Sequence, residues 1–222
     1  MELLDILDWF NYITEALLGA VFALLCFRQA QKNHPAVLFY YLLGGFFACV
    51  LMSDAFYILI WAIEDYPFVF SAGDISWVGS YFFLITIALN FTQSWTPTQK
   101  EAARKYRWPA LAAPAACAAF NAVYIAIYPQ IFINYTLYAL PTAILLYLSL
   151  WLYLAGKKAA IQPALSRYHL TVFIWLALQL ICDLFSTLGD IRVYAAIGTV
   201  FWIIVMLLML GIFFSAKKGV SP

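Results

Sequence analysis

Charged side chains are scarce in this sequence. Asp, Glu, Lys and Arg together make up 10% of its 222 residues, 66% of the residues are hydrophobic, and the mean hydropathy is +0.88. A water-soluble domain has roughly a quarter charged residues, so this composition excludes a soluble globular protein and indicates an integral membrane protein. The longest polar connection runs only from about Thr96 to Arg107, which leaves no room for a second folded domain. We therefore expect residues 1–222 to form one transmembrane domain.

Motifs that bind cofactors or metals are also missing. The sequence contains no GxGxxG, P-loop, HExxH or GxSxG pattern, so nucleotide binding, zinc proteolysis and ordinary serine hydrolysis have no support. A retinal-binding opsin of the microbial type needs a lysine in its last helix, and residues 192–214 contain none. The four cysteines lie in apolar segments without CxxC or Cys/His spacing, which argues against zinc sites and disulfides. We predict no cofactor and no metal.

Long apolar segments are what the sequence does contain. A membrane-spanning helix needs about 20 mostly apolar residues. Seven segments meet this requirement, at about 9–28, 36–63, 74–95, 108–128, 131–155, 167–189 and 192–214. The predicted fold class is therefore all-α, a polytopic membrane bundle of seven transmembrane helices.

The basic residues between these segments predict the orientation in the membrane. Eleven of the twelve fall in connections on one side, and only Arg192 falls on the other. Because Lys and Arg are enriched in cytoplasmic loops, we expect the N-terminus outside and the C-terminus inside a multi-pass plasma (inner) membrane protein. The basic residues suit lipid headgroups better than nucleic acid. The predicted partner is therefore a membrane lipid or a small-molecule ligand, with no nucleic acid.

Three short motifs of the first three segments recur in the same order in the last three. The matched pairs are NY at 11 and 134, D-x-F at 54 and 183, and G-[ST]-x-F at 79 and 198. Such self-similarity is typical of an internal repeat. We predict a parallel 3+1+3 arrangement, with repeat A at about 9–95, a linker helix at about 108–128 and repeat B at about 131–214.

Two aspartates interrupt apolar stretches at matching points of this repeat. Asp54 lies in LMSDAFYIL and Asp183 in LICDLFSTL. An ionised carboxylate in hydrocarbon costs roughly 3 kcal/mol or more, so residues of this kind usually serve a function. Since no buried Lys or Arg is available to compensate them, we expect at least one aspartate to be protonated and the two to share one proton. Asp54 and Asp183 are the candidate catalytic residues.

Further polar and aromatic side chains are expected around the two aspartates, lining a pocket that opens to the outer face. The candidate substrate-binding residues are Glu15, Tyr57, Ser80, Tyr81, Tyr138 and Gln179. Polar side chains within a span face the interior of a bundle rather than lipid. The alternative is a structural role, in which they hydrogen-bond one helix to the next.

Several positions resemble the YhhN-type lysoplasmalogenase family, and the resemblance follows most of the chain in helix order. The matching positions are Ser53-Asp54, Gly79, Phe82, Pro141 and Cys182-Asp183. This resemblance implies a polytopic enzyme that hydrolyses the vinyl ether of lysophospholipids. One aspartate would act as the neutral acid and the other as the base. The sequence departs from the family pattern in the serine before Asp54, in lacking a histidine at 74–95, and in having seven spans instead of eight.

Two other functions fit the same sequence. A parallel 3+1+3 bundle also resembles the sweet and PQ-loop transporters, in which buried carboxylates carry coupling protons. Against this alternative, the Pro129-Gln130 pair lies in an outer connection. The third possibility is a sensor or receptor module that works through partners, because the sequence holds no complete catalytic motif.

Overall fold

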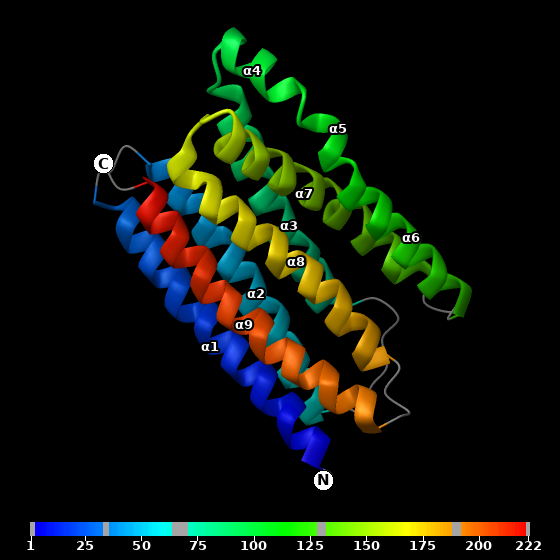
Figure 1. The fold of residues 1–222 in the computed structure, drawn as a ribbon. Coiled ribbons are helices and arrows are strands. Elements are labelled where there is room, and N and C mark those ends of the chain that lie inside the picture. Colours follow the sequence, from blue (N-terminus) through cyan, green and yellow to red (C-terminus); the bar gives the residue numbers. More distant parts are fainter. Residues whose placement is uncertain (1–2, 33–35, 64–70, 128–131, 188–191, 221–222) are drawn as a thin grey trace. The chain divides into compact units, whose positions relative to one another are not determined.

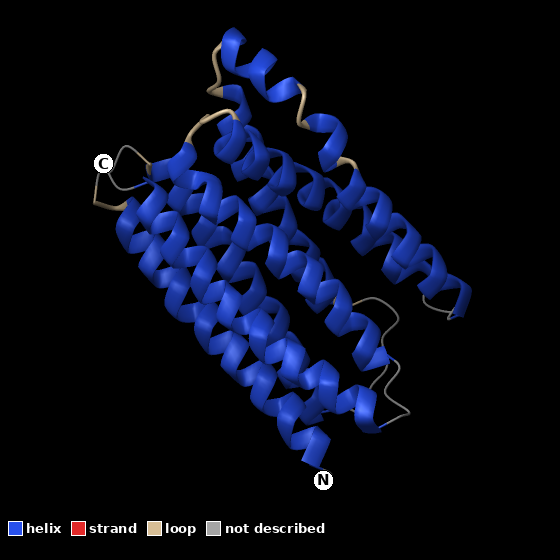
Figure 2. Ribbon diagram, in the orientation of Figure 1, coloured by secondary structure: helices blue, strands red, loops and turns tan. Residues whose placement is uncertain are grey.

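The computed structural model of the chain describes residues 3–32, 36–63, 71–127, 132–187 and 192–220. Within these residues the regular elements are helices, and no strand occurs among them (Figure 2). The elements in chain order are α1 (Leu3–Ala30), α2 (Val37–Ile63), α3 (Ala72–Gln93), α4 (Pro97–Arg104), α5 (Arg107–Ala110), α6 (Ala112–Ile127), α7 (Phe132–Lys158), the 3₁₀ helix η2 (Pro163–Leu165), α8 (Ser166–Thr187) and α9 (Arg192–Val220) (Figure 1).

The seven predicted apolar segments are confirmed as helices. The described residues contain seven helical stretches that are long and apolar enough to cross a membrane, one in each predicted segment. Large apolar side chains such as Leu17, Leu24 and Met52 remain exposed on these helices, as is expected where lipid replaces water around them. The all-α class and a multi-pass architecture are therefore supported, while the repeat and the orientation of the termini stay predictions.

A short helix, α4, lies in the connection that the composition marked only as polar. Thr96 precedes it, and the Thr96 Oγ1 accepts a hydrogen bond from the Gln99 backbone N–H at 3.3 Å. The Gln99 Oε1 in return accepts from the Thr96 N–H at 3.0 Å. This reciprocal capping, with Pro97 at the first helical position, starts the helix.

The span predicted at 108–128 is divided at Leu111 into α5 and α6. Pro114 has no N–H and cannot donate to the carbonyl of Ala110. The N–H of Leu111 donates back to the carbonyls of Arg107 and Trp108 at 3.2 and 3.1 Å. Regular bonding resumes where the N–H of Ala115 donates to the Leu111 carbonyl. The interruption therefore follows from the position of one proline.

The chain forms two compact units. Unit 1 comprises residues 1–80 and 177–210, and unit 2 comprises residues 81–176 and 211–222. The boundaries fall inside α3, α8 and α9, so these helices contribute to both units. Ten of the eleven acidic residues belong to unit 1 and nine of the twelve basic residues to unit 2. One unit is thus acidic and the other basic.

Helix pairs lie side by side within each unit. In unit 2, α6 runs along α7 (Figure 1). In unit 1, α1 packs against α2, and a Cβ atom on Gly19 would lie 3.0 Å from the Phe47 carbonyl oxygen and 3.1 Å from the Leu51 nitrogen. Glycine at this point lets the two backbones approach closely, as small residues do between membrane helices.

Candidate functional site

Ring contacts define the register of the α1–α2 pair. The contacting rings, taken from one end of the interface to the other, are Phe27–Tyr41, Phe22–Phe47 and Tyr12–Tyr57, with centroids 6.2, 5.2 and 5.9 Å apart. Residue numbers fall along α1 as they rise along α2. The two helices are therefore antiparallel, and their register is constant over the length of the interface.

Glu15 and Asp54 occupy the same level of this interface. Glu15 follows Tyr12 by three residues and Asp54 precedes Tyr57 by three, so each acid is about one turn from the same ring pair. Glu15 is seven residues from Phe22, and Asp54 is seven residues from Phe47. Seven residues are about two helical turns, so each acid lies on the same face of its helix as the phenylalanine that contacts the other helix. Glu15 exposes 0% and Asp54 1% of its surface. We call these two side chains the acid pair.

Neither helix supplies a cation near the acid pair. Helix α2 contains no Lys or Arg, and Arg28 on α1 is 13 residues from Glu15, or about 20 Å along the axis. The Oδ2 of Asp54 is buried and has no hydrogen-bond partner among the described residues. A buried carboxylate without a compensating charge or donor is strongly unfavourable. Neither α1 nor α2 therefore supplies a Lys or Arg that could compensate a charge on Asp54.

A second polar cluster lies one turn farther along α2. The Tyr57 hydroxyl donates to Asp74 Oδ1 at 2.7 Å, which links α2 to the start of α3. The backbone N–H and the hydroxyl of Ser71 both donate to Asp74 Oδ2 at 2.7 Å, and the Asp74 N–H donates to the Ser71 Oγ at 3.2 Å. An acid in the first turn of a helix also interacts favourably with the helix dipole. Tyr57 therefore lies between the contact with Tyr12 and the capped end of α3.

The other candidates in unit 1 have different surroundings. Ser80 is fully buried, and its hydroxyl donates to the Trp77 carbonyl at 2.6 Å within the same helix. Gln179, on α8, is buried, and its Oε1 has no hydrogen-bond partner in the described part of the chain. Asp183 lies on α8 as well, but its side chain is outside the described residues. The predicted pairing of Asp54 with Asp183 therefore stays a prediction.

Two predicted binding residues belong to unit 2. Tyr81 is buried and meets Trp175 edge-on, with ring centroids 6.1 Å apart. Tyr138 is half-buried on α7. Of the candidate site residues, Glu15, Asp54 and Tyr57 lie within about one turn of one another along the α1–α2 interface.

The sequence placed Glu15 among the binding residues around the two aspartates, but it did not predict that Glu15 is level with Asp54 in the α1–α2 interface. A signal was present, because Asn11, Glu15 and Gly19 recur every four residues and mark one face of α1. The Ser71-x-x-Asp74 spacing likewise marks a helix start. Both features become informative once the register of α1 against α2 is known.

The acid pair places two buried carboxyl groups at one level of the α1–α2 interface. Within the described residues, no group of three or more His, Cys, Asp or Glu side chains could hold a metal ion.

No known family model matches the chain, and neither a curated protein nor a solved structure matches it.

Proposed function

We propose that this chain is a membrane-embedded hydrolase in which the acid pair supplies both a proton and a base. The observation that carries the proposal is the buried Asp54 carboxyl, level with Glu15, with one oxygen unpartnered among the described residues. Two neighbouring carboxyls that compete for one proton are an acid and a base at the same pH. One can protonate a substrate while the other activates water.

The proposed substrate is a lysophospholipid with a vinyl ether, following the resemblance at Ser53-Asp54 and Pro141. The protonated acid adds its proton to the alkene carbon, and the base takes a proton from the attacking water. The resulting hemiacetal breaks down to a fatty aldehyde and the glycerophosphodiester that carried the chain. Asp183 is the third acid of this scheme and the alternative partner of Asp54.

Aldehyde release from a lysoplasmalogen tests the proposal. Purified protein in liposomes should release fatty aldehyde, and the E15Q and D54N variants should each lower the rate at least about a hundredfold, the usual contribution of a general acid or base. Glu101, an exposed acid of unit 2, provides the matched control, since E101Q should leave the rate unchanged. The proposal fails if no aldehyde forms, or if D54N retains the rate.

The D183N variant decides which acid is the partner of Asp54. Loss of aldehyde release with E15Q and retention with D183N supports the acid pair defined above. The reverse result supports the Asp54–Asp183 pair instead.

Proton-coupled transport of a small solute is the second candidate. The complete burial of both acids favours it, because such a site is reached from one side at a time in a transporter. Proteoliposomes that contain a pH-sensitive dye would measure proton movement under an imposed pH gradient. Proton flux that D54N abolishes, without aldehyde release, would support transport over hydrolysis.

A further inference from the structure

The basic residues of unit 2 form an unusually one-sided charge distribution. Unit 2 contains nine Lys and Arg residues and a single acid, Glu101. All nine side chains are exposed: Lys100, Arg104, Lys105, Arg107, Lys157, Lys158, Arg167, Lys217 and Lys218. Glu101 approaches Arg104 at 3.8 Å, and both side chains are about three-quarters exposed, so solvent weakens this ion pair. The positive charge is therefore left largely uncompensated.

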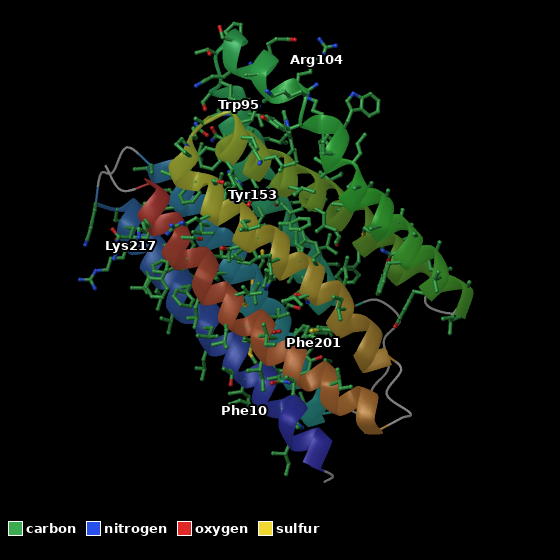
Figure 3. The ribbon with its side chains drawn as sticks, in the orientation of Figure 1. Phe10, Trp95, Arg104, Tyr153, Phe201 and Lys217 are labelled. Atoms are coloured by element: carbon green, nitrogen blue, oxygen red, sulfur yellow. The ribbon has the colours of Figure 1, made fainter. Side chains whose placement is uncertain are left out.

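Side-chain and backbone contacts bring the segments that carry these residues to one end of unit 2. Gln162 accepts a hydrogen bond from the Trp95 indole at 3.5 Å and donates to the Ser94 hydroxyl at 3.3 Å, which joins the end of α3 to the connection after α7. A Cβ atom on Gly219 would lie 2.9 Å from the Ala164 carbonyl oxygen, so the end of α9 packs on η2. The side chains of Arg104 and Lys217 point away from the ribbon (Figure 3).

Arg107 is held in place within this basic end. Its guanidinium carbon lies 4.9 Å from the centroid of the Trp151 ring. The Trp151 indole N–H donates to the Ala103 carbonyl at 3.0 Å, and Trp95 packs against the same ring with centroids 5.3 Å apart. A stacked guanidinium keeps its N–H donors in its own plane, available to an anion. No acidic side chain pairs with Arg107 among the residues that the structure describes.

The next residue indicates the depth of Arg107 in a membrane. Trp108 exposes 78% of its surface, and the apolar stretch that could cross a membrane begins at Arg107. Exposed indoles at the end of a span prefer the headgroup level. An anionic group at that level is the phosphate of a phospholipid.

We propose that the basic end of unit 2 binds anionic phospholipid headgroups, with Arg107, fixed on Trp151, as the phosphate ligand. The planar guanidinium matches two phosphate oxygens, a geometry that lysine does not offer. The neighbouring lysines and arginines then add attraction that depends on charge alone. This inference is independent of the acid pair, because it uses only residues of unit 2.

Binding of phosphatidylglycerol, measured by native mass spectrometry of the full chain against phosphatidylcholine, tests the proposal. Wild-type protein should retain phosphatidylglycerol selectively, and the R107Q variant should weaken this binding at least tenfold. The R107K variant, which keeps the charge but not the planar group, should fall between the two. Arg167 provides the control because it is also exposed and belongs to unit 2. The R167Q variant should weaken phosphatidylglycerol binding by no more than about fivefold, the effect of losing one charge near an anionic surface.

Three results would overturn the proposal. Equal losses in R107Q and R167Q would show diffuse attraction without a fixed ligand. Equal retention of phosphatidylglycerol and phosphatidylcholine would show no preference for anionic lipid. Displacement of the lipid by millimolar inorganic phosphate would show a site for free phosphate. Unchanged thermal unfolding and elution of R107Q would show that its loss of binding is not a loss of fold.

Discussion

Glu15 and Asp54 lie level with one another in the α1–α2 interface, each three residues from its own member of the Tyr12–Tyr57 contact. Both side chains are buried, and the first two spans alone supply them. An acid pair between consecutive antiparallel helices needs no internal repeat to form. Both members of the acid pair therefore belong to unit 1.

Replacing both acids by their amides tests whether they share a proton. The E15Q and D54N variants keep the side-chain shape and remove the proton exchange. Their effects on the free energy of unfolding should be non-additive, with a coupling energy of about 1 kcal/mol or more. Unfolding of the two single variants and the double variant in detergent micelles measures this energy. An additive double variant would show that the two carboxyls do not interact.

The close approach of α1 and α2 predicts that Gly19 cannot be enlarged. In the G19A variant, the added Cβ would lie 3.0 Å from the Phe47 carbonyl oxygen, and overpacking of this kind costs about 1–3 kcal/mol. At Gly79 the nearest atom to an added Cβ is the Cys49 Sγ at 3.5 Å, an ordinary contact. The G79A variant should therefore be neutral or gain up to about 1 kcal/mol in helix propensity. The thermal unfolding temperatures of G19A and G79A measure this difference. Equal stability of the two variants would contradict the close packing at Gly19.

Tyr57 should contribute stability through its hydroxyl. The Y57F variant loses the 2.7 Å bond to Asp74 and keeps the ring beside Tyr12. We expect a loss of roughly 1.5–3 kcal/mol in the free energy of unfolding, because the acceptor is a carboxylate oxygen. Tyr41 is exposed, and its ring also packs on α1. Y41F should therefore change the stability by less than about 0.5 kcal/mol, and a similar loss in both variants would argue against the Tyr57–Asp74 bond.

Two residues in the connection after α7 adopt left-handed backbone conformations. Ala160 has φ of 51° and Gln162 has φ of 50°, a region that costs non-glycine residues about 1–2 kcal/mol. The A160G variant should therefore gain about 1 kcal/mol in unfolding free energy. The Q162G variant relieves the same strain but loses the bonds to Trp95 and Ser94, so it should not gain stability. A gain of equal size in both variants would show that these side-chain bonds contribute nothing.

The spans could be predicted from the sequence because they depend on near neighbours, whereas 108–128 was expected as one helix and its break at Leu111 was not predicted. In lipid, each backbone N–H and C=O bonds within its own helix, so about 20 apolar residues are enough to indicate a span. The break at Leu111 follows from Pro114, and the start of α4 follows from Thr96, Pro97 and Gln99. The capping residues were present in the sequence, although composition alone did not identify α4.

The partners of the functional candidates could not be predicted in the same way. Asp54 was paired with Asp183 because both occur at matching points of a repeated motif, and this pairing stays a prediction because a motif does not determine which helix faces which. The register of α1 against α2 depends on Gly19 and on rings that meet across the interface. These contacts join residues far apart in the sequence.

By itself, the sequence determined an all-α chain with seven apolar spans, one aspartate deep inside the second span, and a strong bias in the distribution of charge. Only the tertiary structure decided that Glu15 is level with Asp54 and that Arg107 lies over Trp151. The reason is physical, because helix formation depends on bonds to residues four positions away, whereas register and stacking depend on how side chains from distant segments pack together.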